Sequence, residues 1–195
     1  MSTTFVLHGG VTSRVTAEND SFFRTFTSAV DKEKVKIVLC YWAKMKERWD
    51  ELSKRDQAKV QQQTTKQVEF SVAHDVDDLY KKLQDADVLY VSGGKATLIE
   101  PYVPKLSALR EKLKGKVYIG SSMGAFICSK QYVLSFASQD SDTVHNGLGL
   151  LPINTLCHWD IEDKKKRKLD LLAYATPKLP TVVLDECQCV TIVDR

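Results

Sequence analysis

The sequence predicts an α/β protein, a three-layer sandwich in which a mostly parallel sheet lies between two layers of helices. Short apolar runs alternate with longer amphipathic segments along the chain, which is the order of elements that builds a parallel sheet. Three of the apolar runs lead directly into polar or glycine-rich turns, where the functional loops of such sheets begin. With 195 residues, 43% of them hydrophobic, the chain is large enough to bury a substantial core. We expect a single domain over residues 1–195, because no linker or internal repeat interrupts the pattern.

The predicted strands are short runs of β-branched and other apolar residues. Thr4–His8 comes first and leads into a glycine turn. Lys36–Tyr41 and Asp87–Ser92 are nearly continuous apolar runs, which are typical of strands buried on both faces. The predicted strands are residues 4–8, 36–41, 68–72, 87–92, 117–119, 182–184 and 190–193, with a further apolar run at 156–159.

The predicted helices carry apolar residues three or four positions apart. Ala17–Val30 has one strongly apolar face, formed by Phe22, Phe23, Phe26, Ala29 and Val30. Lys46–Gln67 is long and charged, so we expect it on the surface, anchored through Trp49, Leu52 and Val60. Further helices are expected at 76–83, 97–114 and 164–175. In the second of these, Pro101 and Pro104 limit the first turns.

The segment Lys116–Ser129 organises the rest of the chain. Its strand passes through Gly120-Ser121-Ser122-Met123-Gly124 into the start of a helix. A Gly-x-Ser-x-Gly sequence in this position predicts a nucleophile elbow, a turn that holds its central residue in a strained conformation with the side chain projecting. Ser122 is therefore the candidate nucleophile, and the amide of Met123 is placed to stabilise an oxyanion.

Three strand ends are expected to meet at one crevice, because functional groups of parallel sheets gather beyond the carboxyl ends of the strands. These ends carry His8-Gly9-Gly10, Ser92-Gly93-Gly94 and Ser121-Ser122. A nucleophilic serine there needs a base, which is usually histidine. His158 follows an apolar run and is the best candidate among His8, His74, His145 and His158.

Composition argues against several classes of partner. The net charge of +3 is spread over 28 basic and 25 acidic residues, so no nucleic-acid partner is implied. The basic run Lys164–Lys168 follows three acidic residues, an order that suits a solvated helix face. The segment Gly93–Thr97 is similar to a phosphate loop, but Leu89 stands where that motif requires glycine. No segment is long enough to cross a membrane.

Cysteine usage predicts a reducing, cytoplasmic environment. The five cysteines are odd in number, and several lie in predicted core elements. Cys187-x-Cys189 lacks the spacing of a metal site, and nothing after Met1 resembles a signal peptide. We therefore expect a cytoplasmic protein with reduced thiols and no metal.

A family resemblance rests on three segments, Val91–Leu98, Tyr118–Ala125 and Cys157–Trp159. Together they resemble the peptidase E (aspartyl dipeptidase) and cyanophycinase family of serine peptidases. The resemblance implies the class I glutamine-amidotransferase-like (flavodoxin-like) fold, a small peptide as substrate and no cofactor. It also implies roles for particular residues: Ser122 as nucleophile, His158 as base, and Gly93, Gly94 and Met123 around the oxyanion.

The acid of the triad is less sharply indicated. In the family it lies between the serine and the histidine, in the loop after the elbow helix. By that resemblance Asp140 is our first choice and Asp142 the second. Asp160 and Glu186 stay open, since both are expected near strand ends.

The chain departs from the family pattern at Lys95, where the family commonly has asparagine. Lys95 at the crevice rim and Arg167 from the basic run are predicted to bind a substrate carboxylate, which would favour Asp-X dipeptides. The leading hypothesis is a dipeptidase-like serine hydrolase. The alternatives are an esterase for small substrates and a non-catalytic binding or regulatory member of the same fold. Oligomeric state is not indicated.

Overall fold

A six-stranded sheet forms the centre of the computed structural model, which describes residues 2–135 and 142–194. Its strand order is β10-β1-β5-β4-β2-β3, and all neighbours are parallel except β10, which runs antiparallel to β1. The mixed α/β class with a mostly parallel sheet is thereby confirmed. The strands are β1 (Thr3–His8), β2 (Lys34–Cys40), β3 (Gln67–Val72), β4 (Val88–Val91), β5 (Val117–Ser121) and β10 (Cys189–Asp194).

A second, four-stranded sheet lies beside the first, with the order β7-β6-β8-β9. Strands β6, β8 and β9 are parallel, and β7 is antiparallel to β6. The sequence predicted a single sheet, and this second one was missed because β6 and β7 have only three residues each. The strands are β6 (Gln131–Val133), β7 (Val144–Asn146), β8 (Asn154–Cys157) and β9 (Thr181–Leu184).

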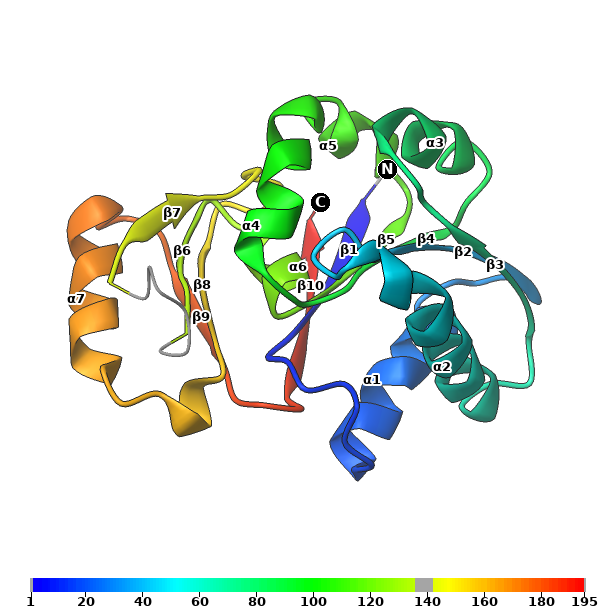
Figure 1. Cartoon of the computed structure of the whole chain (residues 1–195), viewed down its shortest axis with the longest axis horizontal. Coiled ribbons are helices and arrows are strands. Elements are labelled where there is room, and N and C mark those ends of the chain that lie inside the picture. Colours follow the sequence, from blue (N-terminus) through cyan, green and yellow to red (C-terminus); the bar gives the residue numbers. More distant parts are fainter. Residues whose placement is uncertain (1, 136–141, 195) are drawn as a thin grey trace.

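Helices cover both faces of the six-stranded sheet (Figure 1). One face carries α1 (Ala17–Ser28) and α2 (Trp49–Gln62), and the other carries α3 (Val76–Lys82) and α5 (Leu109–Lys112). Helix α7 (Lys165–Ala175) packs on β6 and β7 at the outer side of the second sheet. Helix α6 (Met123–Cys128) contacts strands of both sheets, so it lies at their junction. No helix in the described ranges combines the length and apolar character that a membrane crossing needs.

Two helix predictions are corrected. The expected helix over 97–114 is broken into α4 (Ala96–Ile99), a 3₁₀ segment η2 (Glu100–Lys105) and α5. Pro101 and Pro104 explain the break, because each removes a backbone donor and crowds the preceding turn. The expected helix over 46–67 begins with the 3₁₀ turn η1 (Lys46–Arg48) and ends at Gln62. The chain then enters β3 at Gln67.

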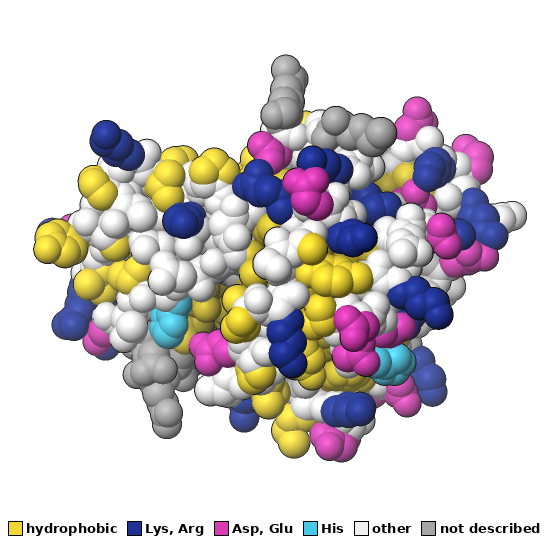
Figure 2. Space-filling view, turned by 90° about the horizontal axis from the view of Figure 1, so that it is seen from above, with side chains coloured by type: hydrophobic (Ala, Val, Ile, Leu, Met, Phe, Trp, Pro, Cys, Tyr) yellow, Lys and Arg dark blue, Asp and Glu magenta, His cyan; other side chains and the backbone are white. Residues whose placement is uncertain are grey.

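The basic run Lys164–Lys168, which forms the N-terminal end of α7, is only partly solvated. Lys166 and Arg167 are exposed, as predicted for a helix face, but the Lys168 side chain is 1% exposed. Lys168 pairs with the equally buried Glu162 and donates to the Leu134 carbonyl at 2.7 Å. On the face seen in Figure 2, acidic and basic side chains are intermingled rather than gathered by sign.

Candidate active site

Ser122 occupies a strained turn between β5 and α6. Its φ of 47° and ψ of −105° are unusual for a residue with a side chain. The two flanking glycines are required by close approach of the backbone. A Cβ on Gly120 would lie 2.5 Å from the Gly124 carbonyl oxygen, and one on Gly124 would lie 2.1 Å from that of Val91. These contacts and the serine's dihedral angles are those of a nucleophile elbow.

His158 reaches the serine from the second sheet. It follows β8 in a left-handed conformation, with φ 57° and ψ 37°, and its Nε2 lies 3.0 Å from Ser122 Oγ. Its backbone amide donates to the Gly9 carbonyl, 3.2 Å away, at the end of β1. A Cβ on Gly10 would lie 2.3 Å from the imidazole Cε1, so only glycine leaves room for the ring. The histidine is therefore held between the ends of β1 and β8.

Glu186 contacts the other nitrogen of His158. Its Oε1 lies 2.9 Å from Nδ1, and its side chain is only 5% exposed. Its second oxygen lies 2.7 Å from the guanidinium of Arg14, and its backbone amide donates to Asp160 Oδ1 at 2.8 Å. The glutamate is thus fixed at three points, with one carboxylate oxygen directed at the imidazole.

The other candidate acids lie elsewhere. Asp142 pairs with Lys164 and Arg167, at 3.2 and 3.3 Å, while Asp160 holds the Glu186 backbone rather than the histidine. Asp140 lies outside the described residues.

The register of β8 and β9, in which Cys157 pairs with Leu184, would have pointed to Glu186. His158 and Glu186 follow these two residues closely, so they leave the sheet at the same end. Because β9 was not known to pair with β8, the sequence did not rank this glutamate first.

A cavity of about 340 Å³ opens beside Ser122. Gly93 lies so close to the serine that a Cβ there would be 2.9 Å from Ser122 Cβ. Met123 is the first residue of α6, where backbone amides have no partner within the helix. The residues that line the cavity are Val11, Thr12, Ser13, Tyr41, Lys44, Leu52, Arg55, Tyr90, Ser92, Gly93, Gly94, Ser121, Ser122 and His158. Two of the three predicted strand ends, Ser92-Gly93-Gly94 and Ser121-Ser122, thus line the cavity, and after the third, His8-Gly9-Gly10, the chain continues into it through Val11, Thr12 and Ser13.

Two cations in the cavity wall were missed by the sequence reasoning. Lys44 follows β2, and Arg55 projects from α2, where it lies 2.7 Å from the fully buried Asp56 carboxylate. The Tyr41 hydroxyl donates to the other Asp56 oxygen at 3.0 Å. A usable signal was Asp56 itself, because it falls on the same helical stripe as the buried Trp49. A carboxylate at a core position requires a buried cationic or hydroxyl partner.

Lys95 and Arg167, the two residues predicted to bind a substrate carboxylate, do not line the cavity as Lys44 and Arg55 do. Lys95 is exposed next to Gly94, and its side chain does not line the cavity. Arg167 lies on α7 and pairs with Asp142. It also lines a separate shallow hollow on the surface, together with Tyr174. The structure does not bring Arg167 to the serine.

Ser121 and His8 form a second, fully buried serine–histidine contact behind the elbow. Ser121 Oγ lies 3.2 Å from His8 Nδ1, which also accepts the Gly10 amide at 3.1 Å. His8 Nε2 lies 2.9 Å from Asn19 Oδ1, so the ring carries its proton on Nε2. Burial is the main cause that lowers the pKa of His8 to about 4. This histidine is therefore neutral near pH 7.

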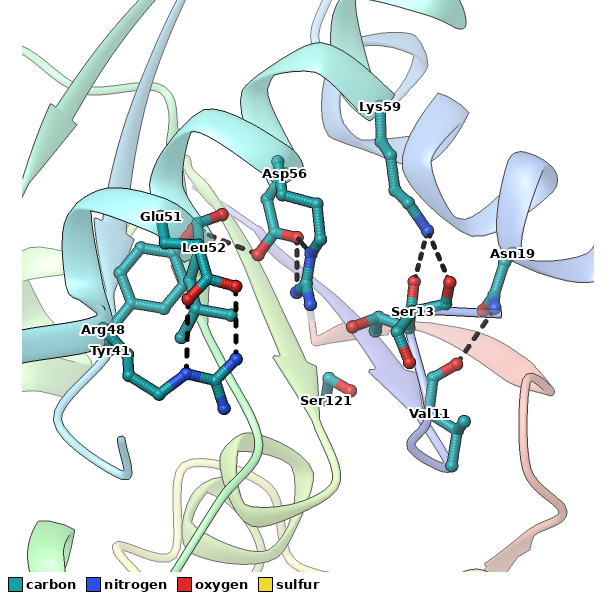
Figure 3. A network of polar contacts seen from close by, with 12 residues as sticks. Val11, Ser13, Asn19, Tyr41, Arg48, Glu51, Leu52, Asp56, Lys59 and Ser121 are labelled. Atoms are coloured by element: carbon teal, nitrogen blue, oxygen red, sulfur yellow. Dashed lines mark hydrogen bonds and ion pairs between the residues drawn. The ribbon is translucent and has the colours of Figure 1, made fainter. Parts of the chain in front are cut away.

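The loop from Val11 to Arg14 is held over the cavity by polar contacts from two helices (Figure 3). Lys59 of α2 donates to the Thr12 carbonyl at 2.6 Å. Asn19 of α1 donates to the carbonyls of Val11 and Arg14 at 3.1 and 2.9 Å. The loop thus joins the cavity wall to Glu186 through Arg14.

A mostly parallel α/β sheet that presents a strained serine to a histidine defines the class of the serine hydrolases with a nucleophile elbow. Residues 5–195 match the family model described as "Peptidase family S51". The chain therefore belongs to peptidase family S51, and it is a serine-type peptidase.

Two solved structures share the fold. One is a peptidase from an acI-B1 Actinobacterium, with a TM-score of 0.67 and 15% identity over 98% of this chain and 84% of that chain. The other is a putative peptidase E protein from Listeria monocytogenes EGD-e, with a TM-score of 0.63 and 18% identity over 100% of this chain and 99% of that chain. A search of curated proteins found no match.

Proposed function

We propose that this peptidase cleaves small peptides, as a dipeptidase does, through a triad of Ser122, His158 and Glu186. One observation carries the proposal. An unbroken line of contacts runs from Ser122 Oγ to His158 Nε2 at 3.0 Å and from His158 Nδ1 to Glu186 Oε1 at 2.9 Å. This is the geometry in which a histidine takes the serine proton while a carboxylate fixes its tautomer.

The reaction would begin with attack of Ser122 Oγ on the peptide carbonyl carbon, as its proton moves to His158 Nε2. The carboxylate of Glu186 would stabilise the imidazolium that forms. The oxyanion of the tetrahedral intermediate would lie against backbone amides of Met123 and of the Gly93-Gly94 segment. His158 would then protonate the leaving amine, and water would hydrolyse the acyl-enzyme by the same proton transfers in reverse.

The size of the cavity supports a small substrate. About 340 Å³ is near the lower end of ligand pockets in proteins. The cations in its wall support a preference for an acidic residue, as in Asp-X dipeptides. Lys95 stays a candidate for binding a substrate carboxylate at the rim of the cavity. The position of Arg167 does not support a role in substrate binding.

A fluorophosphonate probe tests the proposal directly, because it labels only an activated serine. We expect labelling at Ser122 in the wild type and none in Ser122→Ala or His158→Ala. Matched panels of dipeptides and small esters then separate a peptidase from an esterase. A wild type that resists the probe and cleaves no dipeptide would overturn the proposed function.

A further inference from the structure

The order of the strands divides the candidate active site into two sides. Ser122 follows β5, which lies between β1 and β4. His158 bonds to the end of β1, so the base stands on the β1 side of the serine. The cavity extends to both sides: Val11, Thr12 and Ser13, which follow β1, line one part, and another part runs past Gly93 after β4 to Lys44 after β2. In a serine hydrolase the histidine protonates the leaving group, so the leaving residue lies on its side. The acyl residue then lies in the part of the cavity on the β4 and β2 side, toward Lys44.

The wall of this acyl side carries one more positive charge than negative charge. Lys44 and Arg55 line it, and Asp56 lies buried behind Arg55. No ion pair of Lys44 occurs among the described residues. Burial, together with the charges of Arg55 and Arg48, lowers the pKa of the Lys44 ammonium. One carboxylate beside Lys44 would relieve both the repulsion and the charge imbalance.

Independent evidence for a ligand comes from a hydroxyl group in the same wall. Ser92 is 3% exposed, lines the cavity, and its Oγ has no hydrogen-bond partner within the described part of the chain. A buried hydroxyl without a partner is costly, so a polar group that enters this part of the cavity gains a hydrogen bond there. A bound carboxylate or amine in the cavity would supply the missing partner.

Arg55 is oriented before any ligand arrives. Its guanidinium lies 2.7 Å from Asp56, whose side chain is fully buried and also accepts from the Tyr41 hydroxyl. The Arg55 side chain itself is 33% exposed, so part of its donor fork faces the cavity. Asp56 and Tyr41 therefore act as positioning residues for the arginine.

We propose that Lys44 and Arg55 form a carboxylate-binding subsite for the side chain of the acyl residue, the one whose carbonyl Ser122 attacks. This assignment rests on the proposed hydrolysis and replaces Lys95 and Arg167 as the main determinants of acidic specificity. It predicts that the enzyme distinguishes aspartate from asparagine at this position, two side chains of nearly the same shape.

The test compares kcat/KM for Asp-Leu and Asn-Leu in the wild type and in Lys44→Met. We expect the Asp/Asn ratio to fall by about one to two orders of magnitude, mainly through KM, because a charge-assisted hydrogen bond is lost. Hydrolysis of Asn-Leu should fall much less than hydrolysis of Asp-Leu, because asparagine has no charge for Lys44 to bind. Lys54→Met removes the same charge from an exposed position on α2 and should leave the ratio intact.

Arg55 needs a paired variant, because Arg55→Gln alone would leave the buried Asp56 without its cation. The double change Arg55→Gln with Asp56→Asn removes both charges, and circular dichroism checks its fold. We expect the same loss of Asp/Asn discrimination. A ratio that stays at the wild-type value in both Lys44→Met and the folded double variant would overturn the subsite.

The carboxylate that Lys44 and Arg55 bind could instead be the C-terminal carboxylate of the leaving residue. A substrate with an amidated C-terminus lacks that carboxylate and so distinguishes it from the side chain of the acyl residue. With Asp-Leu-amide as substrate, we expect Lys44→Met to lose as much activity as it does with Asp-Leu. If amidation alone abolishes the effect of Lys44→Met, the cations bind the C-terminal carboxylate and our assignment is wrong.

A binding measurement keeps the subsite separate from catalysis. Calorimetry with L-aspartate and L-asparagine on Ser122→Ala should show preference for aspartate, lost when Lys44→Met is added. If the wild type resists fluorophosphonate but this preference is present, the subsite stands and the proposed hydrolysis falls. If Lys44 has no effect on aspartate binding, the subsite falls whatever the enzyme hydrolyses.

Discussion

Ser121 and Ser122 are adjacent serines whose surroundings give them different properties. Ser122 projects toward His158 from a strained backbone, with φ 47°. Ser121 points behind the elbow to His8, 3.2 Å away, and is 2% exposed. At the scale of single residues, the direction of a side chain rather than its type therefore separates a candidate nucleophile from a structural hydroxyl.

We expect Ser122→Ala to reduce turnover by about 10⁶-fold, the usual cost of removing a triad nucleophile. Thermal stability should barely change, because alanine fits the site. Ser121→Ala should keep most activity and cost about 1 kcal/mol of stability, since His8 Nδ1 still accepts the Gly10 amide. Turnover and thermal melts of the two variants give the comparison, and equal activity in both would mean that the elbow is only a turn.

Replacing Glu186, the proposed triad acid, should be nearly as informative. Glu186→Gln keeps the shape of the side chain but removes the charge that stabilises imidazolium, so turnover should fall by up to about 10⁴-fold. Asp142→Asn should have little effect, because Asp142 pairs with Lys164 and Arg167 at the N-terminal end of α7. The variant Asp140→Asn distinguishes between Asp140 and Glu186 as the acid. If it lowers turnover and Glu186→Gln does not, the acid is the one that the family resemblance favoured.

The buried His8 predicts a pH dependence of stability. Its pKa is lowered from 6.5 to about 4, so between these values the unfolded chain binds a proton that the folded chain does not. The contribution is fully favourable above about pH 6.5 and is lost as the pH falls toward 4, by about 3 kcal/mol in total. Urea unfolding of wild type and His8→Gln at pH 7.5, 6 and 4.5 checks this. Parallel pH dependences in the two proteins would contradict it.

At the scale of elements, close packing of α6 against β4 fixes the position of the elbow. Gly124 permits that packing, since a Cβ there would lie 2.1 Å from the Val91 carbonyl oxygen. Helix α6 is buried along its whole length and contacts both sheets. The elbow is therefore set by contacts that a small shift of this helix would break.

Gly124→Ala should push α6 away from β4 and destabilise the fold by about 1–3 kcal/mol, as overpacking does. Activity should fall with it, because Ser122 is the residue before α6. Gly149→Ala is a matched control: its φ is +64°, but a Cβ there would meet nothing nearer than 3.6 Å. It should cost about 1 kcal/mol and leave kcat unchanged. Similar kinetic losses in both would show that strain, not packing, is responsible.

At the scale of the whole molecule, the candidate triad depends on two sheets. Ser122 follows β5 of the six-stranded sheet, whereas His158 and Glu186 follow β8 and β9 of the four-stranded one. The distance between nucleophile and base is thus set by how the sheets pack, with α6 at their junction.

This division explains what the sequence could and could not predict. Long apolar runs such as Lys36–Tyr41 and the glycine-flanked Ser122 have strong local patterns, so the central strands and the elbow were predicted closely. The short strands β6 and β7 have no such pattern, and without them the second sheet and its pairing of β8 with β9 could not be foreseen. For the same reason Glu186 was kept only as an open alternative and the cations Lys44 and Arg55 were missed: their positions follow from tertiary contacts between distant segments.

The separation of nucleophile and acid along the chain has a consequence during protein synthesis. Ser122 leaves the ribosome 64 residues before Glu186, which is about 3 to 13 s earlier at ordinary rates of translation. During that interval the nascent chain carries Ser122 without the complete set of groups proposed to activate it. If Ser122, His158 and Glu186 form the proposed triad, the growing polypeptide cannot cleave peptides until β8 and β9 have been made and docked.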